Sequence, residues 1–232
     1  MKKLIPILFI LAILLCSCTN EATPKLGGFQ SENGYWYLDF EDPTVEVKQE
    51  VKVTLSDGTK DTAYICRPIV NVDNDGANTV SKSIKTYLDE KYGSYFKKPD
   101  DRIVKVDYES YANNDILTIV ITENITTPDG TSSYATCFYY DDLAGSELNM
   151  MEYSNTNGAQ LSTVYEAVIE SDWAAEYEKT SGNPPYEDVI TGMVCHGDLK
   201  FDVYCIEPDG INVTKLELQV EDVPLQLPEL SY

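Results

Sequence analysis

The sequence is poor in the residues on which most enzyme chemistry and nucleic-acid binding depend. It has one histidine, His196, and 17 basic residues against 39 acidic ones in 232 positions, giving a formal net charge of −22 at pH 7. A single histidine excludes sites built from several imidazoles. The shortage of lysine and arginine excludes clustered contacts to nucleic-acid phosphates or to an anionic lipid surface. We therefore expect no nucleic-acid partner.

Familiar catalytic motifs are also absent. The chain has no Gly-x-Ser-x-Gly elbow, phosphate-binding loop or Cys-x-x-Cys pair. Residues 71–76 imitate the opening of a calcium loop, but the twelfth position is Lys82 where a bidentate Glu is needed, so a turn before a helix is predicted. Cys195 and His196 are adjacent, and neighbours in a strand point to opposite faces. We expect a protein that is not an enzyme and has no catalytic residue, cofactor or metal site.

Long hydrophobic runs are missing except at the N-terminus. Residues 4–15 form an apolar run of twelve after Lys2 and Lys3, whereas spanning a bilayer takes about 20 residues. The following Leu15-Cys16-Ser17-Cys18-Thr19 resembles a bacterial lipobox. Cys18 fits better than Cys16, which follows the bulky Leu15. We predict a lipoprotein signal peptide at 1–17, lipidation at Cys18 and anchoring on the extracytoplasmic face of the cell membrane; the alternative is an ordinary secretory signal.

Removal of residues 1–17 leaves 215 residues with 15 basic and 39 acidic side chains, a balance of −24. Residues 18–34 are predicted to be a polar tether, and residues 35–228 a single domain. Four cysteines remain available, and they are expected either to form disulfides in one of three pairings or to stay buried thiols. They are Cys66, Cys137, Cys195 and Cys205.

The hydrophobic pattern predicts an α+β fold: an antiparallel sheet with two amphipathic helices packed on it. Apolar residues with helical spacing cover residues 77–92, closed by Gly93, and residues 161–173. Residues 116–121 are apolar at both parities, which indicates a central strand covered on both faces. Pro68 indicates an edge strand or a strand end. Strand patterns cover residues 45–55, 62–70, 104–108, 116–121, 133–140, 189–195, 201–206 and 211–220.

The acidic residues of the second helix are predicted to form its solvated side. Strong negative charge either keeps an exported domain soluble or attracts a cationic partner. The residues in question are Glu166, Glu170, Asp172, Glu176 and Glu178.

Three segments of the sequence resemble those of a known family. Residues 65–70 read ICRPIV, residues 116–121 read ILTIVI and residues 138–148 read FYYDDLAGSEL. They are similar to the extracytoplasmic domain of RsiV-type anti-sigma factors, a family also found in uncharacterised bacterial envelope lipoproteins and beside some peptidoglycan deacetylases. The resemblance covers residues 35–228. In place of the family's Gly-Ala-His-like turn, this chain has Pro128-Asp129-Gly130-Thr131.

The resemblance implies binding, with lysozyme as the ligand of the RsiV type. No sigma-binding segment is expected beside the signal peptide or after Tyr232, and no deacetylase domain. The sequence thus predicts a membrane-anchored binding lipoprotein whose partner is a cationic, lysozyme-like protein. The alternatives are a peptidoglycan or carbohydrate binder that uses some of the 17 tyrosines, and a carboxylate-dependent hydrolase.

Overall fold

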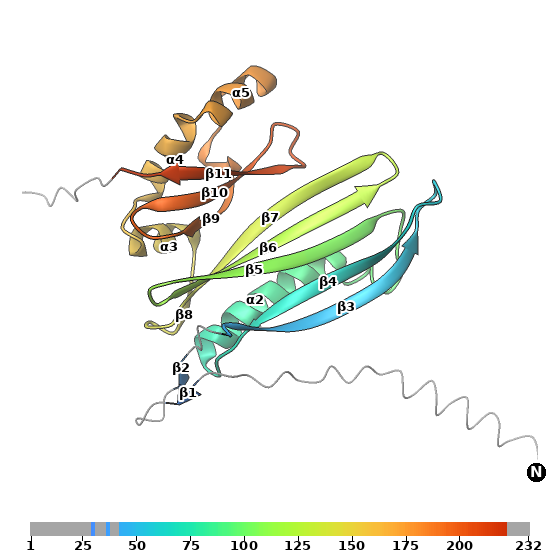
Figure 1. Cartoon of the computed structure of the whole chain (residues 1–232), viewed down its shortest axis with the longest axis horizontal. Helices are drawn as coiled ribbons and strands as arrows, with labels where there is room; N and C mark the ends of the chain where they lie inside the picture. The colour runs from blue at the N-terminus through green and yellow to red at the C-terminus, as the bar shows by residue number, and fades with distance from the viewer. Residues whose placement is uncertain (1–28, 31–35, 38–41, 222–232) are drawn as a thin grey trace, which may run out of the picture.

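The computed structural model describes residues 29–30, 36–37 and 42–221 (Figure 1). The predicted signal peptide, the predicted lipidation site at Cys18 and the chain beyond Glu221 lie outside these residues. Two short strands, β1 (Phe29–Gln30) and β2 (Trp36–Tyr37), pair antiparallel with each other.

A six-stranded sheet forms the body of the domain, with its strands adjacent in chain order. Every neighbouring pair is antiparallel except β4 and β5, which run parallel because helix α2 crosses between them. The predicted α+β class is confirmed, with this one parallel step added. The elements are β3 (Thr44–Thr54), β4 (Lys60–Val70), α2 (Asp75–Tyr92), β5 (Ile103–Asn113), β6 (Ile116–Thr127), β7 (Gly130–Asp141) and β8 (Ser146–Leu148).

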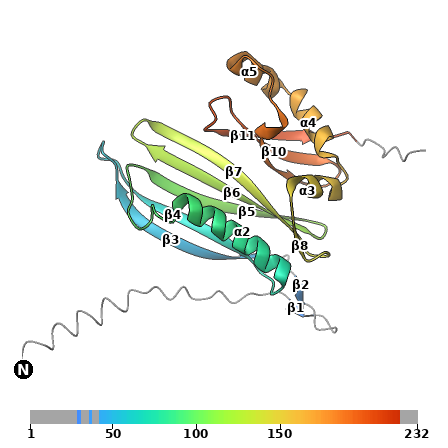
Figure 2. The same ribbon diagram turned by 180° about the vertical axis from the view of Figure 1, so that it is seen from behind.

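Helix α2 covers one face of this sheet (Figure 2). The Asn74 side chain caps it by accepting a 2.8 Å hydrogen bond from the Ala77 N–H, and Gly93 follows its last residue. The calcium-like stretch is therefore a turn and a helix cap, as predicted. Gly76 is required here because a Cβ at this position would lie 1.9 Å from the carbonyl oxygen of Gly145.

Strand β6 is covered on both faces, which confirms its prediction as the central strand. Leu117, Ile119 and Ile121 face α2 and are fully buried. Ile116 and Val120 belong to clusters on the opposite face. The two faces of one strand thus contribute to separate cores.

A second, three-stranded sheet covers the face of β6 and β7 that α2 leaves free. Gly192 makes the contact close: a Cβ there would lie 2.4 Å from the Cys137 Sγ. The middle strand of this small sheet is buried over most of its length. The strands are β9 (Ile190–Cys195), β10 (Lys200–Ile206) and β11 (Val213–Gln219), preceded by the short helix η1 (Glu187–Val189).

Three helices pack on the outer side of the small sheet (Figure 1): α3 (Met150–Thr156), α4 (Leu161–Ile169) and α5 (Asp172–Ser181). The prediction of two helices in all was incomplete. The connection at 148–158 contains α3, and the helix predicted at 161–173 breaks because Ser171 caps a new helix by accepting from the Ala174 N–H. Among the helices described, none is both long and apolar enough to cross a membrane.

Tyrosine hydroxyls cap the outer edge of β9. Tyr139 and Tyr153 stack with ring centroids 4.0 Å apart. The N–H of Met193 donates to the Tyr139 hydroxyl at 3.0 Å, and that of Cys195 to the Tyr153 hydroxyl at 2.7 Å. An edge strand otherwise leaves such N–H groups unpaired. Of the 14 tyrosines within 42–221, six are buried, seven are half-buried and only Tyr186 is exposed.

Strand β4 is an interior strand of the sheet, not an edge. Its pairing with β5 covers only Tyr64 and Ile65, so Pro68 interrupts no hydrogen-bond ladder on that side.

The four cysteines of the domain are free thiols. Burial raises the pKa of Cys137 and of Cys205 to about 12, which keeps both protonated at neutral pH.

Candidate binding surface

The net negative charge of residues 42–221 comes entirely from the second part of this range. Residues 42–105 contain eleven basic and eleven acidic side chains. Residues 106–221 contain three basic side chains, Lys179, Lys200 and Lys215, against 22 acidic ones, a balance of −19. We call residues 106–221 the acidic half; it comprises most of β5, strands β6–β8, the small sheet and helices α3–α5.

Helices α4 and α5 carry the most concentrated part of this charge. Their five predicted acidic residues are exposed, as are Glu187 and Asp188 after them. The one lysine in this region, Lys179, lies 3.0 Å from Glu176, and both side chains are mostly exposed. Such a surface ion pair contributes little. The surface therefore stays strongly negative.

A pocket of about 370 Å³ lies where α5 meets the turn between β10 and β11. Trp173 and Tyr177 line it from α5, with ring centroids 5.1 Å apart and ring planes inclined by 48°. Its polar lining contains three acidic residues, Glu176, Glu207 and Asp209, together with Thr180 and Asn212. We call it the aromatic pocket.

The carboxylates from the β10–β11 turn are held in place. Glu207 Oε1 accepts from the indole Nε1–H of Trp173 at 3.1 Å and from the hydroxyl of Thr214. Asp209 Oδ1 accepts the N–H groups of Ile211 and Asn212 at 2.8 and 3.0 Å, and these bonds hold the pKa of Asp209 below its usual value. Within 42–221, no lysine or arginine pairs with either carboxylate.

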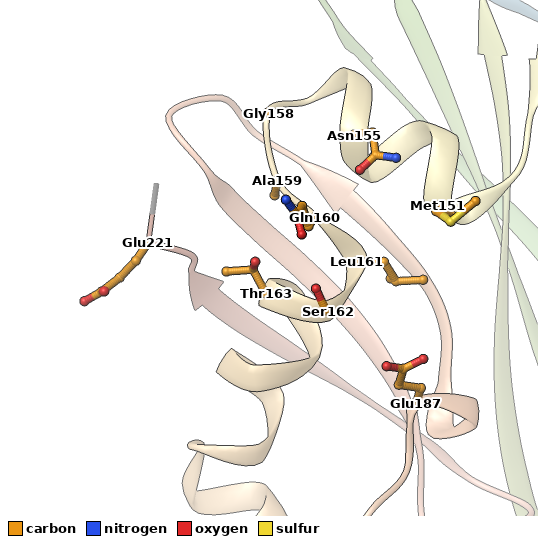
Figure 3. A pocket seen from close by; sticks show the side chains of 10 residues that line it. All are labelled: Met151, Asn155, Gly158, Ala159, Gln160, Leu161, Ser162, Thr163, Glu187 and Glu221. Carbon is orange, nitrogen blue, oxygen red and sulfur yellow. The ribbon is translucent and has the colours of Figure 1, made fainter. Parts of the chain in front are cut away.

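A larger cavity, of about 630 Å³, lies at the start of α4 (Figure 3). Gln160 precedes this helix without capping it through its side chain. Glu187 and Glu221 lie on opposite sides of Ser162 and Thr163 in the close view. A helix N-terminus favours anions, whereas two carboxylates repel them, so the cavity has no clear charge preference.

His196 lies in the turn after β9, whereas Cys195 is buried in the core between the small sheet and helices α3–α5. The His196 Nε2 is 3.0 Å from Asp202 Oδ2, which also binds Lys215 Nζ at 3.0 Å, and the rings of His196 and Tyr111 make a T-shaped contact. Asp202 was not predicted from the sequence, although an acidic residue inside an apolar strand is a signal of a paired charge. A cavity of about 560 Å³ lies beside the pair.

A second buried carboxylate was also missed. Glu123 on β6 is fully buried and contacts the hydroxyls of Tyr87 and Tyr92 and the Nζ of Lys91, the last at 2.9 Å. Burial, then the contact with Glu123, raises the pKa of Tyr92, so its hydroxyl stays a donor. This cluster ties the end of α2 to the sheet. Over residues 42–221, no group of three His, Cys, Asp or Glu side chains is arranged to hold a metal ion.

No protein-family model and no curated protein matches this chain. Among solved structures, a DUF3298 family protein from Pseudomonas aeruginosa PAO1 is similar to it, with 10% sequence identity and a TM-score of 0.45. The match covers 78% of this chain and 93% of that one. Similarity at this level carries no argument about function, which rests on this chain's own residues.

Proposed function

We propose that the protein is a lipid-anchored, extracytoplasmic binding protein whose acidic half captures a cationic protein such as a lysozyme. The segregation of charge carries this proposal: residues 42–105 balance to zero, while residues 106–221 carry −19. Solubility requires net charge but no particular placement. Attraction of a cationic partner to one face requires charge on that face.

Exposed apolar side chains lie next to the acidic ones and supply contacts that charge alone lacks. Met151, Ile169 and Tyr186 are 55%, 41% and 64% exposed. Each directly precedes an acidic residue in the chain. Stable interfaces combine a few such anchors with a polar, charged rim. The resemblance to the RsiV type makes lysozyme the first ligand to test.

Lysozyme is expected to bind the protein at both low and physiological salt. Its association rate should fall as salt rises, because the Debye length shrinks to about 8 Å at 0.15 M. Its dissociation rate should change little, since it depends on short-range contacts. Surface binding with immobilised protein measures both rates. Cytochrome c, another small basic protein, is the control: equal binding of the control, or loss of both at 0.15 M salt, would leave only a solubility role for the charge.

Replacing Cys18 by Ala is expected to release the protein from the membrane. The apolar run at 4–15 has twelve residues, whereas a stable span takes about 20, so lipid must hold the mature protein. Membrane fractionation measures the distribution. Cys16→Ala is the matched control and should stay in the membrane fraction. Retention of the Cys18→Ala variant would refute the lipid anchor.

A further inference from the structure

We propose that the aromatic pocket receives the guanidinium group of an arginine side chain. This inference rests on the proposed function, since the arginine would belong to the cationic partner. The pocket presents two aromatic rings, Trp173 and Tyr177, beside the carboxylate of Glu207. A planar cation stacks on an aromatic face and donates along its edge to a carboxylate, which is the combination that guanidinium satisfies.

Glu207 has an acceptor oxygen to spare. Its Oε1 accepts from Trp173 and Thr214, whereas within 42–221 no donor is hydrogen-bonded to its Oε2. A carboxylate offers about four lone-pair sites, so both oxygens keep capacity for a ligand. The same bond from Trp173 fixes the carboxylate next to the indole. The Glu207 carboxylate is thus held in a fixed orientation and can accept further hydrogen bonds from a ligand.

The walls of the pocket are preorganised. Asn212 holds the β10–β11 turn to β7 by accepting the Ser133 N–H at 3.0 Å through its side chain. Its backbone carbonyl accepts the Glu207 N–H at 2.7 Å, and the Gly210 N–H closes the turn on the Glu207 carbonyl at 2.8 Å. A rigid site loses less entropy when a side chain enters. A volume of about 370 Å³ suits one long side chain.

Arginine fits this lining better than the other candidates. A lysine ammonium can also lie over an aromatic ring, as Lys91 does over Tyr87, but it is a compact point charge without the planar set of donors by which guanidinium stacks and binds a carboxylate at once. A sugar ring also stacks on aromatic residues, but it gains nothing from the charge of Glu176, Glu207 and Asp209, which no arginine or lysine other than Lys179 offsets within the described chain. The two ligand classes are therefore separable by experiment.

The test follows the indole N–H signal of Trp173 by NMR in the 15N-labelled full-length chain. The Trp173→Phe variant identifies this signal and separates it from that of Trp36. Nα-acetyl-arginine amide is expected to shift the Trp173 signal saturably, with a millimolar dissociation constant. Nα-acetyl-citrulline amide, its neutral isostere, should bind at least about tenfold more weakly because it lacks the charge. Equal binding of the two, no saturable shift, or tighter binding of N-acetylglucosamine trimer would overturn the proposal.

Two double variants test whether the arginine probe binds in the aromatic pocket. Glu176→Gln with Glu207→Gln removes two charges from the pocket, while the amide oxygen introduced by the second change can still accept from Trp173. Glu166→Gln with Glu170→Gln removes two charges from exposed positions outside it. The pocket pair should weaken the arginine probe by about tenfold and the control pair by less than about twofold. If the variant with both pocket substitutions does not fold, the Glu176→Gln single variant is tested in its place. Its affinity for the arginine probe should fall about threefold. Equal losses in pocket and control variants would contradict the assignment.

The two proposals fail in different ways. If the arginine probe binds and lysozyme does not, the pocket stands and the proposed function falls. If lysozyme binds, but the probe does not and the pocket pair weakens lysozyme no more than the control pair, the acidic half binds without the pocket. In that case the pocket proposal is wrong and the proposed function remains.

Discussion

The Ile119→Asp variant is expected to unfold at a much lower temperature than the unaltered protein or to lose its cooperative thermal transition. Ile119 is fully buried in β6 and packs in the core beneath α2. An unpaired charge at such a position costs at least about 4 kcal/mol. Domains of this size are stable by about 5–15 kcal/mol, so the variant would lose a large part of this stability or all of it. Circular dichroism during heating measures the transition.

Asn124→Asp is the matched control for this variant. It places the same carboxylate on the same strand at an exposed position. Its melting temperature should stay within a few degrees of the unaltered protein, because surface substitutions usually change stability by no more than about 0.5 kcal/mol. A cooperative transition of Ile119→Asp close to that of the control would show that β6 is not the central strand.

Lys91→Met is expected to destabilise the domain by about 3 kcal/mol, because it leaves the fully buried charge of Glu123 with only tyrosine hydroxyls as partners. Adding Glu123→Leu should restore part of the loss, because the double variant no longer buries a charge. Urea unfolding of both single variants and the double variant gives the coupling energy, expected at about 1–3 kcal/mol.

Lys85→Met provides the comparison on the same helix. Lys85 pairs with Asp89, and both side chains are about half exposed, so the loss should be under about 0.5 kcal/mol. If the effects of Lys91→Met and Glu123→Leu simply add, the two groups do not depend on each other and the buried cluster does not tie α2 to the sheet.

Local patterns were enough to predict most elements of the fold. Helix α2 ends at Tyr92 before Gly93, as its apolar spacing and its glycine predict. Strands β5, β6 and β7 coincide with three predicted strand patterns, and the middle one is apolar on both sides, as its place between the other two requires. The break between α4 and α5 was missed because the apolar stripe continues across Ser171, and only the cap made by its hydroxyl separates the helices.

The candidate binding surface was predictable only in part. Exposure of the acidic residues on α4 and α5 follows from the helical pattern. The aromatic pocket does not, since it joins Trp173 to Glu207, which is 34 positions later in the chain. The buried carboxylates of Glu123 and Asp202 also depend on partners from other elements. Local sequence patterns do not indicate which elements far apart in the chain come into contact.

We propose that the placement of charge, not its total, attracts a cationic partner. Two triple variants, each three Glu→Gln changes at exposed positions, test this most directly. One lies in the acidic half, at Glu166, Glu170 and Glu178; the other lies in the balanced half, at Glu46, Glu50 and Glu90.

The measurement is the association rate of lysozyme with each triple variant at low salt. Both variants change the net charge by the same three units, so any difference between them reflects position alone. We expect the acidic-half variant to associate about tenfold more slowly than the unaltered protein and the balanced-half variant to change less than about twofold. Equal slowing of the two variants would contradict the account, because the charge would then act only through its total.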